Sequence, residues 1–290
     1  MEYDVLPRSM AYFTASKGYK SGGFFVVTSG DDNSYKPEQL TAFDLGIRNR
    51  FFDNTLQINL EAYYWQYRDQ QLSAVGYTAS GGIAFTTRNA GSANPRGIDA
   101  DIIWKATPND TLSVSASFIR ARYEKFDIDY PAALISLLRA GPDCHIPAAP
   151  QPNASGFPVY KISCAGAPLP RTPEWSGNVN YQHIVPLSNR ASLTTNIGAT
   201  LATSRFLSAD YYVPELRDGG YALLNADLTY TPPSGAWSIT AFGRNLTDHP
   251  VYQGGFPDIL NGFGGPASPT FIARTIGEPR TYGVRATINF

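Results

Sequence analysis

The sequence has little charge, few cysteines and few methionines, and it lacks a long apolar run. Charged residues make up only 16% of the 290 residues, against about 25% in soluble domains. No uninterrupted apolar run approaches the roughly 18 residues that a transmembrane helix requires, which excludes a helical membrane protein but not a membrane barrel. The net charge of -1 offers no field that would attract nucleic acid, so we expect no nucleic-acid partner.

Catalytic and metal-binding patterns are also missing. His145, His183 and His249 are scattered along the chain, and there is no GxSxG, HExxH or Walker-type sequence. Neither cysteine belongs to a CxxC pair, and only one histidine lies nearby, which disfavours zinc. We therefore predict no catalytic residues, no metal and no cofactor, and we expect that the protein is not an enzyme.

The two cysteines, Cys144 and Cys164, lie 20 positions apart in one Gly/Pro-rich stretch. One interpretation is a disulfide that closes a loop in an oxidising compartment, where it would stabilise the loop by roughly 3 kcal/mol. The alternative is a pair of free thiols in a cytosolic loop. We favour the disulfide.

What the sequence does contain is typical of strands and turns. Aromatic residues reach 13%, and there are 26 Gly and 22 Pro. The last eleven residues alternate strictly, so that one face of a strand would carry small, polar or charged side chains. The other face would be apolar and would carry Tyr282, Val284, Ala286, Ile288 and Phe290. A strand of this kind that ends on a terminal Phe is typical of the closing strand of a bacterial outer-membrane barrel. We therefore assign these five residues to the barrel-insertion signal.

Similar alternation recurs along the whole chain. Most of the alternating segments are about 10 to 15 residues long, which meets the length of about 9–11 residues that crosses a bilayer at a tilt. The predicted strands are Ser9–Lys17, Thr41–Phe51, Thr55–Asp69, Arg96–Ala106, Thr111–Tyr123, Pro173–Ile184, Arg190–Ser204, Tyr221–Thr231, Ala236–Leu246 and Arg280–Phe290. We also expect a short helix over Ala132–Arg139.

Short and long connections alternate between these strands. The short ones carry the Asp, Asn, Pro or Gly of tight turns: Phe52–Asn54, Thr107–Asp110, Val185–Asn189 and Pro232–Gly235. The long ones are Gly18–Leu40, Gln70–Pro95, Glu124–Thr172, Arg205–Gly220 and Thr247–Pro279. Outer-membrane barrels sort their connections in this way, with short turns in the periplasm and long loops outside. Glu2–Val5 then reads as the lower end of a further strand, so we expect the chain to begin in mid-strand.

Four sequence motifs carry a family resemblance. They are Tyr19-Lys20-Ser21-Gly22-Gly23-Phe24, Arg88-Asn89-Ala90-Gly91-Ser92-Ala93 with the following Arg96-Gly97-Ile98-Asp99-Ala100-Asp101, Gly243-Arg244-Asn245-Leu246-Thr247-Asp248, and Gly277-Glu278-Pro279-Arg280-Thr281-Tyr282-Gly283-Val284. Together they resemble the C-terminal part of a TonB-dependent outer-membrane receptor. The resemblance implies an all-β, antiparallel transmembrane β-barrel, of which residues 1–290 would supply about ten of 22 strands as a single domain without the plug and the TonB box.

The resemblance also implies a function and partners. Such receptors import scarce ligands from outside the cell, and a ferric siderophore is the leading ligand class. The expected partners are outer-membrane lipid and the barrel assembly machinery, with the TonB complex reached only through the N-terminal part that this chain lacks. We expect the bacterial outer membrane as the location.

Two sets of residues are candidates for the transport path. Charged residues on the polar faces of the strands would project into the lumen and contact the plug or ligand, or merely solvate the interior: Asp44, Arg48, Arg50, Glu61, Asp99, Asp101, Lys105, Asp227, Arg244 and Arg285. Loop aromatics and cations suit flat anionic ligands, although for any single aromatic we favour packing on other aromatics or a place at the membrane interface. The candidates are Tyr77, Arg139, Tyr160, Lys161, Tyr211, Tyr212, Arg217, Phe256, Phe263 and Arg274.

Two other functions stay open at this level. A self-contained barrel of ten or twelve strands would act as a passive porin or adhesin. An outer-membrane enzyme would need a nucleophile and a base on neighbouring strands, and no Ser or Thr is obviously paired with His183 or His249.

Overall fold

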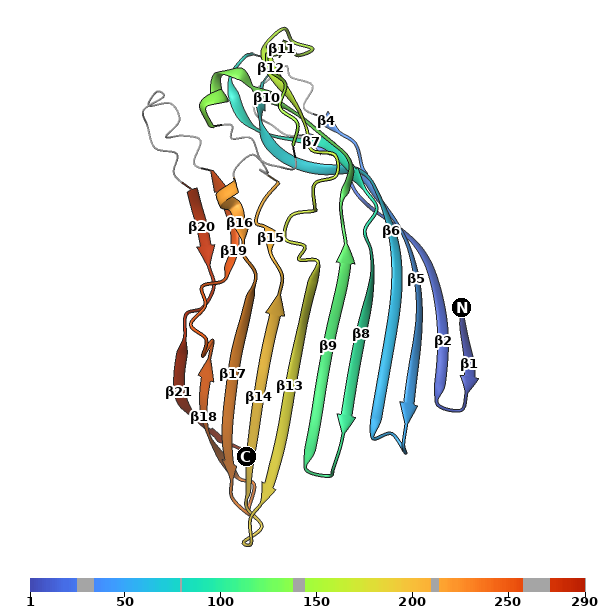
Figure 1. Ribbon diagram of the computed structural model, residues 1–290, viewed down its shortest axis with the longest axis vertical. Helices are drawn as coiled ribbons and strands as arrows, with labels where there is room; N and C mark the ends of the chain where they lie inside the picture. The colour runs from blue at the N-terminus through green and yellow to red at the C-terminus, as the bar shows by residue number, and fades with distance from the viewer. Residues whose placement is uncertain (25–33, 79, 138–143, 210–213, 258–271, 290) are drawn as a thin grey trace.

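The fold is that of a computed structural model, in which the described residues are 1–24, 34–78, 80–137, 144–209, 214–257 and 272–289. Its main feature is an antiparallel sheet whose strands stand side by side in a tall curved wall (Figure 1). The wall strands follow the order of the chain: β1 (Glu2–Leu6), β2 (Ser9–Lys20), β5 (Glu38–Phe51), β6 (Leu56–Tyr77), β8 (Arg96–Lys105), β9 (Asp110–Arg120), β13 (Trp175–Pro186), β14 (Ser192–Ala202), β17 (Tyr221–Thr231), β18 (Trp237–Arg244) and β21 (Thr281–Ile288). The predicted all-β antiparallel fold is confirmed.

The connections between wall strands differ at the two ends of the sheet (Figure 1). At the lower end, tight turns join neighbouring strands, and polar residues adopt the backbone conformations that these turns need. Asp53 and Asn54 have φ angles of 53° and 69° between β5 and β6, a left-handed conformation that Asp and Asn tolerate better than most residues. The longer connections lie at the upper end, as the spacing of turn residues predicts.

Cross-strand register divides the sheet into two faces. Residues directly opposite each other in an antiparallel pair point to the same side. On one side, apolar residues oppose apolar residues from strand to strand, as in the row Leu60↔Ala100↔Ala116↔Gly177↔Leu201. We call this side the apolar face and the other side the polar face.

The apolar face is not covered by a second layer. Leu45, Ile98 and Leu228, which lie on β5, β8 and β17, are 59%, 55% and 44% exposed. A soluble β-sandwich would bury such a face against another sheet. Uncovered leucine and isoleucine rows on tall strands are instead typical of a sheet that faces hydrocarbon.

The upper end contains strands that the sequence analysis does not predict. Gln70–Pro95 and Glu124–Thr172, which we expected to be long loops, include regular strands, so this expectation is wrong. Strand β6 continues to Tyr77, and the added strands are β7 (Ile83–Ala93), β10 (Tyr123–Pro131), β11 (Gln151–Pro152) and β12 (Pro158–Ser163). Tyr123 begins β10 rather than ending β9. Bulges explain the error, because register shifts between Tyr67 and Gln71 and between Tyr123 and Lys125 break the two-residue period.

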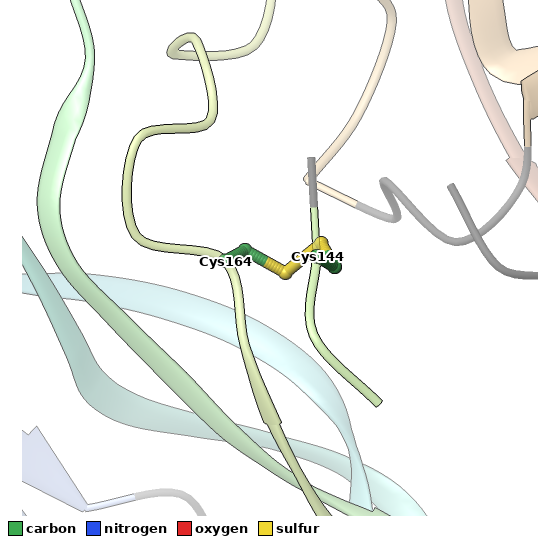
Figure 2. Close-up of a disulfide and its surroundings, with 2 residues drawn as sticks. All are labelled: Cys144 and Cys164. Carbon is green, nitrogen blue, oxygen red and sulfur yellow. A yellow bond between two sulfur atoms is a disulfide. The ribbon is translucent and has the colours of Figure 1, made fainter. Parts of the chain in front are cut away.

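These upper strands enclose a hydrophobic core of their own. Tyr123, Phe126, Tyr130 and Ile162 are almost fully buried there. Cys164 lies in the same core and forms a disulfide with Cys144, with Cα atoms 4.1 Å apart (Figure 2). The disulfide therefore fastens the segment before β11 to the end of β12, and we call β7, β10 and β12 with this core the upper subdomain.

The remaining elements are short. They are β3 (Gly23–Phe24), β4 (Ser34–Tyr35), β15 (Arg205–Phe206), β16 (Arg217–Asp218), β19 (Tyr252–Pro257), β20 (Ile272–Ile276) and the 3-10 helices η1 (Ala132–Leu137) and η2 (Pro214–Leu216). The helix predicted over Ala132–Arg139 is thus a 3-10 helix within the described residues. None of the described helices is long and apolar enough to cross a membrane. The predicted residues Arg139, Tyr211, Tyr212, Phe263 and Phe290 lie outside the described residues.

Candidate functional site

The polar face gathers the charged residues that alternation predicts for it. Its rows include Thr14↔Asp44↔Tyr63↔Gly97 and Asn59↔Asp101↔Ser115↔Asn178. Strand parity then places all the predicted lumen-facing charges on this face: Asp44, Arg48, Arg50, Glu61, Asp99, Asp101, Lys105, Asp227, Arg244 and Arg285. Whether they contact a plug or a ligand stays a prediction.

One cluster on this face is built around Tyr12. Its hydroxyl donates a hydrogen bond to the Glu61 carboxylate, and the Arg48 guanidinium lies over its ring, 4.9 Å from the centroid. Gly46 sits directly opposite both Tyr12 and Glu61. A Cβ atom at Gly46 would come within 2.3 Å of the Tyr12 ring, so the glycine makes room for the aromatic ring between the cation and the carboxylate.

A second cluster lies beside the first, on β5, β6 and β8. The Trp65 indole donates to Asp44 at 3.1 Å, and the Trp65 and Tyr63 rings stack with centroids 4.7 Å apart. Tyr63 lies over Gly97, its partner across the strands. Nearby, one oxygen of Asp99 is buried and accepts no hydrogen bond from the described residues. Asp99 also lines a hollow of the polar face together with Asp101 and Ser115.

The polar face carries a different cluster on its C-terminal strands. Arg244 donates to Asp227 at 2.8 Å, and the guanidinium groups of Arg244 and Arg285 lie 5.4 and 5.5 Å from the centroid of the Phe242 ring. The two cations share one aromatic ring, and Arg244 alone pairs with the carboxylate. The C-terminal part of the polar face therefore carries two cations and one carboxylate. The part on β5, β6 and β8 carries both signs: Asp44, Glu61, Asp99 and Asp101 with Arg48, Arg50 and Lys105. Glu61 lies directly opposite Asp99, so the surroundings of Asp99 are acidic.

The described loop residues of the predicted ligand-contact set fall into two groups. In the upper subdomain, Tyr160 packs on the core and Lys161 is exposed. Tyr77, at the end of β6, stacks its ring on Phe157, with ring centroids 5.2 Å apart. The other group lies on β16 and β20, where Arg274 donates to the backbone oxygen of Glu215, two residues from Arg217. Phe256 lies on β19. The structure thus does not gather the predicted set into one place, and ligand contact stays a prediction for each residue.

An arginine cleft near the upper end of the wall is the feature that sequence reasoning missed. The cleft has a volume of about 110 Å³, and its lining includes Arg122, Arg205, Arg217, Ser204 and Phe206. Segments 120–122, 168–174 and 204–217 approach one another there, and no local pattern in the sequence signals that approach.

The arginines of this cleft are only partly neutralised. Arg205 forms a buried ion pair with Asp218 at 3.6 Å, whereas Arg122 and Arg217 pair with no carboxylate among the described residues. Their guanidinium groups donate to Gly166 O at 2.8 Å and to Ser204 Oγ at 2.9 Å. Glu174 contributes one negative charge to the lining, so the cleft remains net positive and is suited to an anion.

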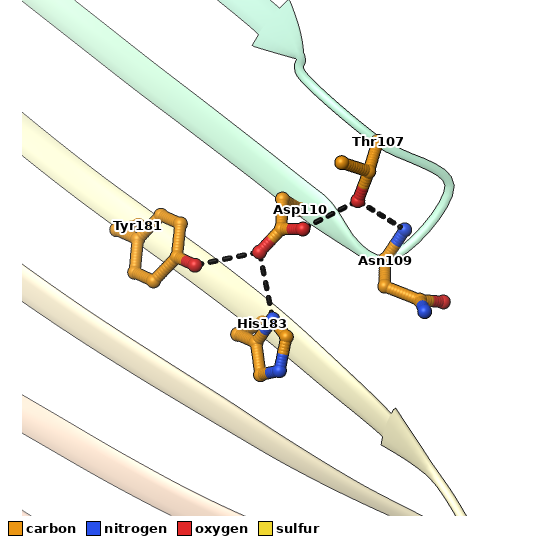
Figure 3. Close-up of polar contacts among 5 residues, drawn as sticks. All are labelled: Thr107, Asn109, Asp110, Tyr181 and His183. Carbon is orange, nitrogen blue, oxygen red and sulfur yellow. Dashed lines mark hydrogen bonds and ion pairs between the residues drawn. The ribbon is translucent and has the colours of Figure 1, made fainter.

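The lower end carries a polar network around Asp110 (Figure 3). Asp110 accepts hydrogen bonds from the Tyr181 hydroxyl at 2.6 Å and from the Thr107 hydroxyl, and it lies 2.7 Å from His183 Nδ1. Tyr181 and His183 occupy apolar-face positions of β13. The described residues place no nucleophile on the histidine, and the arrangement is typical of an aromatic belt at a membrane interface. The described residues also contain no group of three metal-ligating side chains.

Comparison with known proteins gives a consistent family match. A family model described as TonB dependent receptor-like, beta-barrel matches residues 1–246. Among curated proteins, the pesticin receptor of Yersinia pestis is 29% identical over 115 residues, which are 39% of this chain and 16% of that receptor.

Solved structures of receptors and transporters have the same fold. The ferric yersiniabactin uptake receptor of Yersinia pestis superposes with a TM-score of 0.71 at 17% identity, covering 100% of this chain and 36% of that one. The ferric-catecholate import receptor of K12 E. coli gives a TM-score of 0.63 at 14% identity, with 100% and 34% covered. The copper transporter OprC gives 0.60 at 14% identity, with 100% and 38% covered. The chain thus spans about a third of the length of these solved proteins.

Proposed function

Because this chain belongs to the TonB-dependent receptor family of β-barrels, we propose that it forms the C-terminal part of a transporter for an anionic ferric siderophore. Barrels of this family lie in the bacterial outer membrane and are not enzymes. We accordingly assign the apolar face to lipid, the polar face to the lumen and the upper end to the outside of the cell. A plug and a TonB-contacting segment outside this chain would energise the uptake.

The observation that carries the ligand class is the arginine cleft, which at about 110 Å³ has room for an anionic group of a siderophore and not for the whole ligand. Ferric siderophores of the catecholate and carboxylate types are anionic, and guanidinium groups bind such oxygens through charge-assisted hydrogen bonds. Arg122 and Arg217 offer these groups and are ion-paired with no described carboxylate, although Glu174 lines the same cleft. Phe206 contributes an aromatic ring to the lining. Several of the solved relatives are named as siderophore receptors, which agrees with this assignment.

The polar face suits the second half of the transport path. Its acidic part around Asp99 and its basic part around Arg244 and Arg285 offer hydrogen-bond partners of both signs. We propose that a plug seated in the barrel satisfies the free Asp99 oxygen. A passive porin would have no need for such a partner.

Growth under iron limitation tests the proposal. The full-length receptor that contains this chain would be expressed in a strain without siderophore receptors of its own, and ferric catecholates, ferric citrate, haem, cobalamin and copper would be supplied in turn. We expect growth on an anionic ferric siderophore that requires an intact TonB complex. Growth on none of the iron sources, or uptake that persists without TonB, would contradict the proposal.

A variant pair tests the role of the cleft. We expect Arg122→Gln with Arg217→Gln to weaken siderophore binding by about tenfold or more, because two charge-assisted hydrogen bonds are lost. Arg190→Gln, which removes a cation from an exposed turn at the lower end, is the matched control and should bind normally. Equal losses in both variants would show that net charge, and not the cleft, sets the affinity.

A further inference from the structure

Four cations lie near the upper end of the apolar face, on the side of the wall away from the lumen. They are Lys17 on β2, Arg68 on β6, Arg96 on β8 and Arg120 on β9, and all four are exposed. Register places them on this face. Lys17 opposes Thr41 and lies four positions along β2 from Phe13, which opposes Leu45 on the apolar face. Arg68 opposes Gln39, and Arg96 opposes both Tyr64 and Arg120. Asp110, at the lower end of β9, is the only other charged residue at an apolar-face position of β2, β6, β8 and β9 among the described residues.

Their height on the wall matches the surface of a bilayer. Arg120 lies ten positions beyond Asp110 on β9, and the apolar-face residues between them are Leu112, Val114, Ala116 and Phe118. At about 3.4 Å per residue and a tilt of roughly 40°, ten positions rise about 25 Å, which is the height of the apolar band of an outer-membrane barrel. Phe118 and Trp175, with ring centroids 4.6 Å apart, mark the aromatic belt directly below Arg120.

The two arginines at the centre of this group are placed unfavourably unless an anion joins them. Arg96 and Arg120 are direct cross-strand partners, and like charges in that position destabilise a sheet. The guanidinium and ammonium groups of the four cations form no ion pair or hydrogen bond with any described residue. A phosphate group between Arg96 and Arg120 would remove the repulsion and accept hydrogen bonds from both.

We propose that Lys17, Arg68, Arg96 and Arg120 bind the phosphate groups of an anionic lipid in the outer leaflet of the membrane. The occupant is a lipid and not free phosphate, because the apolar residues directly below the cations would hold its acyl chains, with Ile98, Phe118 and Tyr64 nearest to the head group. The site lies on the apolar face of the sheet, and Lys17, Arg68 and Arg96 do not line the arginine cleft, whereas Arg120 lies at the border and lines that cleft as well. The lipid site depends on the family assignment and not on the identity of the transported ligand.

Lipid binding to the full-length receptor tests this site. The delipidated receptor in detergent would be titrated with bisphosphorylated lipid A, dephosphorylated lipid A and inorganic phosphate. We expect tight, salt-sensitive binding of the bisphosphorylated lipid alone, and a loss of about tenfold or more in Arg96→Gln with Arg120→Gln, since each cation at a membrane surface contributes appreciably to anionic lipid binding. Equal binding of both lipids, or saturable binding of inorganic phosphate at similar strength, would overturn the lipid assignment.

Matched variants separate the site from general effects of charge. Arg8→Gln with Arg190→Gln removes two exposed cations from the lower turns and should bind lipid like the parent. Arg96→Lys with Arg120→Lys keeps both charges and should retain most of the affinity. Heat-modifiable migration on a gel would show that each variant is folded. If the double glutamine variant does not fold, the two single variants decide, and an undiminished affinity in both would overturn the proposal.

Discussion

Asn245 ties together two segments that are far apart in the sequence. It is buried, and its φ of 46° lies in the left-handed region. Its side-chain amide donates to His249 O at 3.0 Å and to Glu278 O at 3.2 Å. Asp248 and Arg280 join the same two segments by an ion pair at 3.1 Å. The Asn-Leu-Thr-Asp and Pro-Arg-Thr-Tyr-Gly motifs therefore act as one structural joint at the top of the last hairpin.

Replacing this residue tests the joint. We expect Asn245→Ala to lower the free energy of unfolding by about 1–3 kcal/mol, because buried carbonyl groups lose their donors. Urea unfolding of the detergent-solubilised receptor, followed by heat-modifiable migration, would measure the change. Asn54→Ala, at an exposed turn with a similar φ of 69°, controls for the backbone conformation and should cost less. Equal losses would mean that the hydrogen bonds of Asn245 contribute little.

At the scale of a single strand, β13 offers a direct test of which face meets lipid. Val179 opposes Val114 and Ala199 on the apolar face, whereas Asn180 opposes Ser113 and Gly198 on the polar face. We expect Val179→Lys to destabilise the inserted protein by about 2–4 kcal/mol, because it places a charge in hydrocarbon. Asn180→Lys should insert normally, since its side chain faces the wet lumen. The amount of each variant in the outer-membrane fraction would be compared. Normal insertion of Val179→Lys with failed insertion of Asn180→Lys would show that the polar face, and not the apolar face, meets lipid.

We expect the disulfide to stabilise the upper subdomain without contributing to the stability of the wall. Cys164 belongs to the buried core of this subdomain, and the Cys144–Cys164 bridge closes a loop of 20 residues. We expect replacement of both cysteines by serine to cost roughly 3 kcal/mol locally. Protease added outside intact cells would then cut the loop faster, while heat-modifiable migration of the barrel would not change. Loss of the folded barrel would show instead that the two parts are coupled.

At the scale of the whole molecule, the sheet has two free edges among the described residues. In the described pairing, β1 pairs only with β2, and β21 pairs only with β18. Unpaired backbone groups cost several kcal/mol each in a bilayer. This chain covers only 36% of the ferric yersiniabactin uptake receptor, whose remaining residues have no counterpart here. Further strands are therefore needed to close a barrel around the lumen.

Expression of residues 1–290 alone tests this requirement. We expect the isolated chain to give no heat-modifiable monomer after refolding in detergent, because two strand edges stay unpaired. The full-length receptor, refolded in parallel, is the positive control. A stable, heat-modifiable monomer from the isolated chain would contradict this expectation and favour a self-contained porin.

The wall of this protein was readable from the sequence because its signals are local. Alternation with a period of two residues, interrupted by Asn, Asp, Pro and Gly, depends only on neighbours along the chain. The predicted strand Tyr221–Thr231 coincides with β17, and the predicted strand Arg96–Ala106 differs from β8 by one residue. The residues assigned to the polar face follow from the same parity.

Only the tertiary structure decided what lies above the wall. The core residues Tyr123 and Phe126 are three positions apart, because a bulge between them breaks the period of two. Arg122, Arg205 and Arg217 meet in one cleft, and Arg96 faces Arg120, because strand pairing brings distant segments together. Periodicity fixes which way a side chain points, whereas its neighbours depend on register and loop closure, which involve residues far away in the chain.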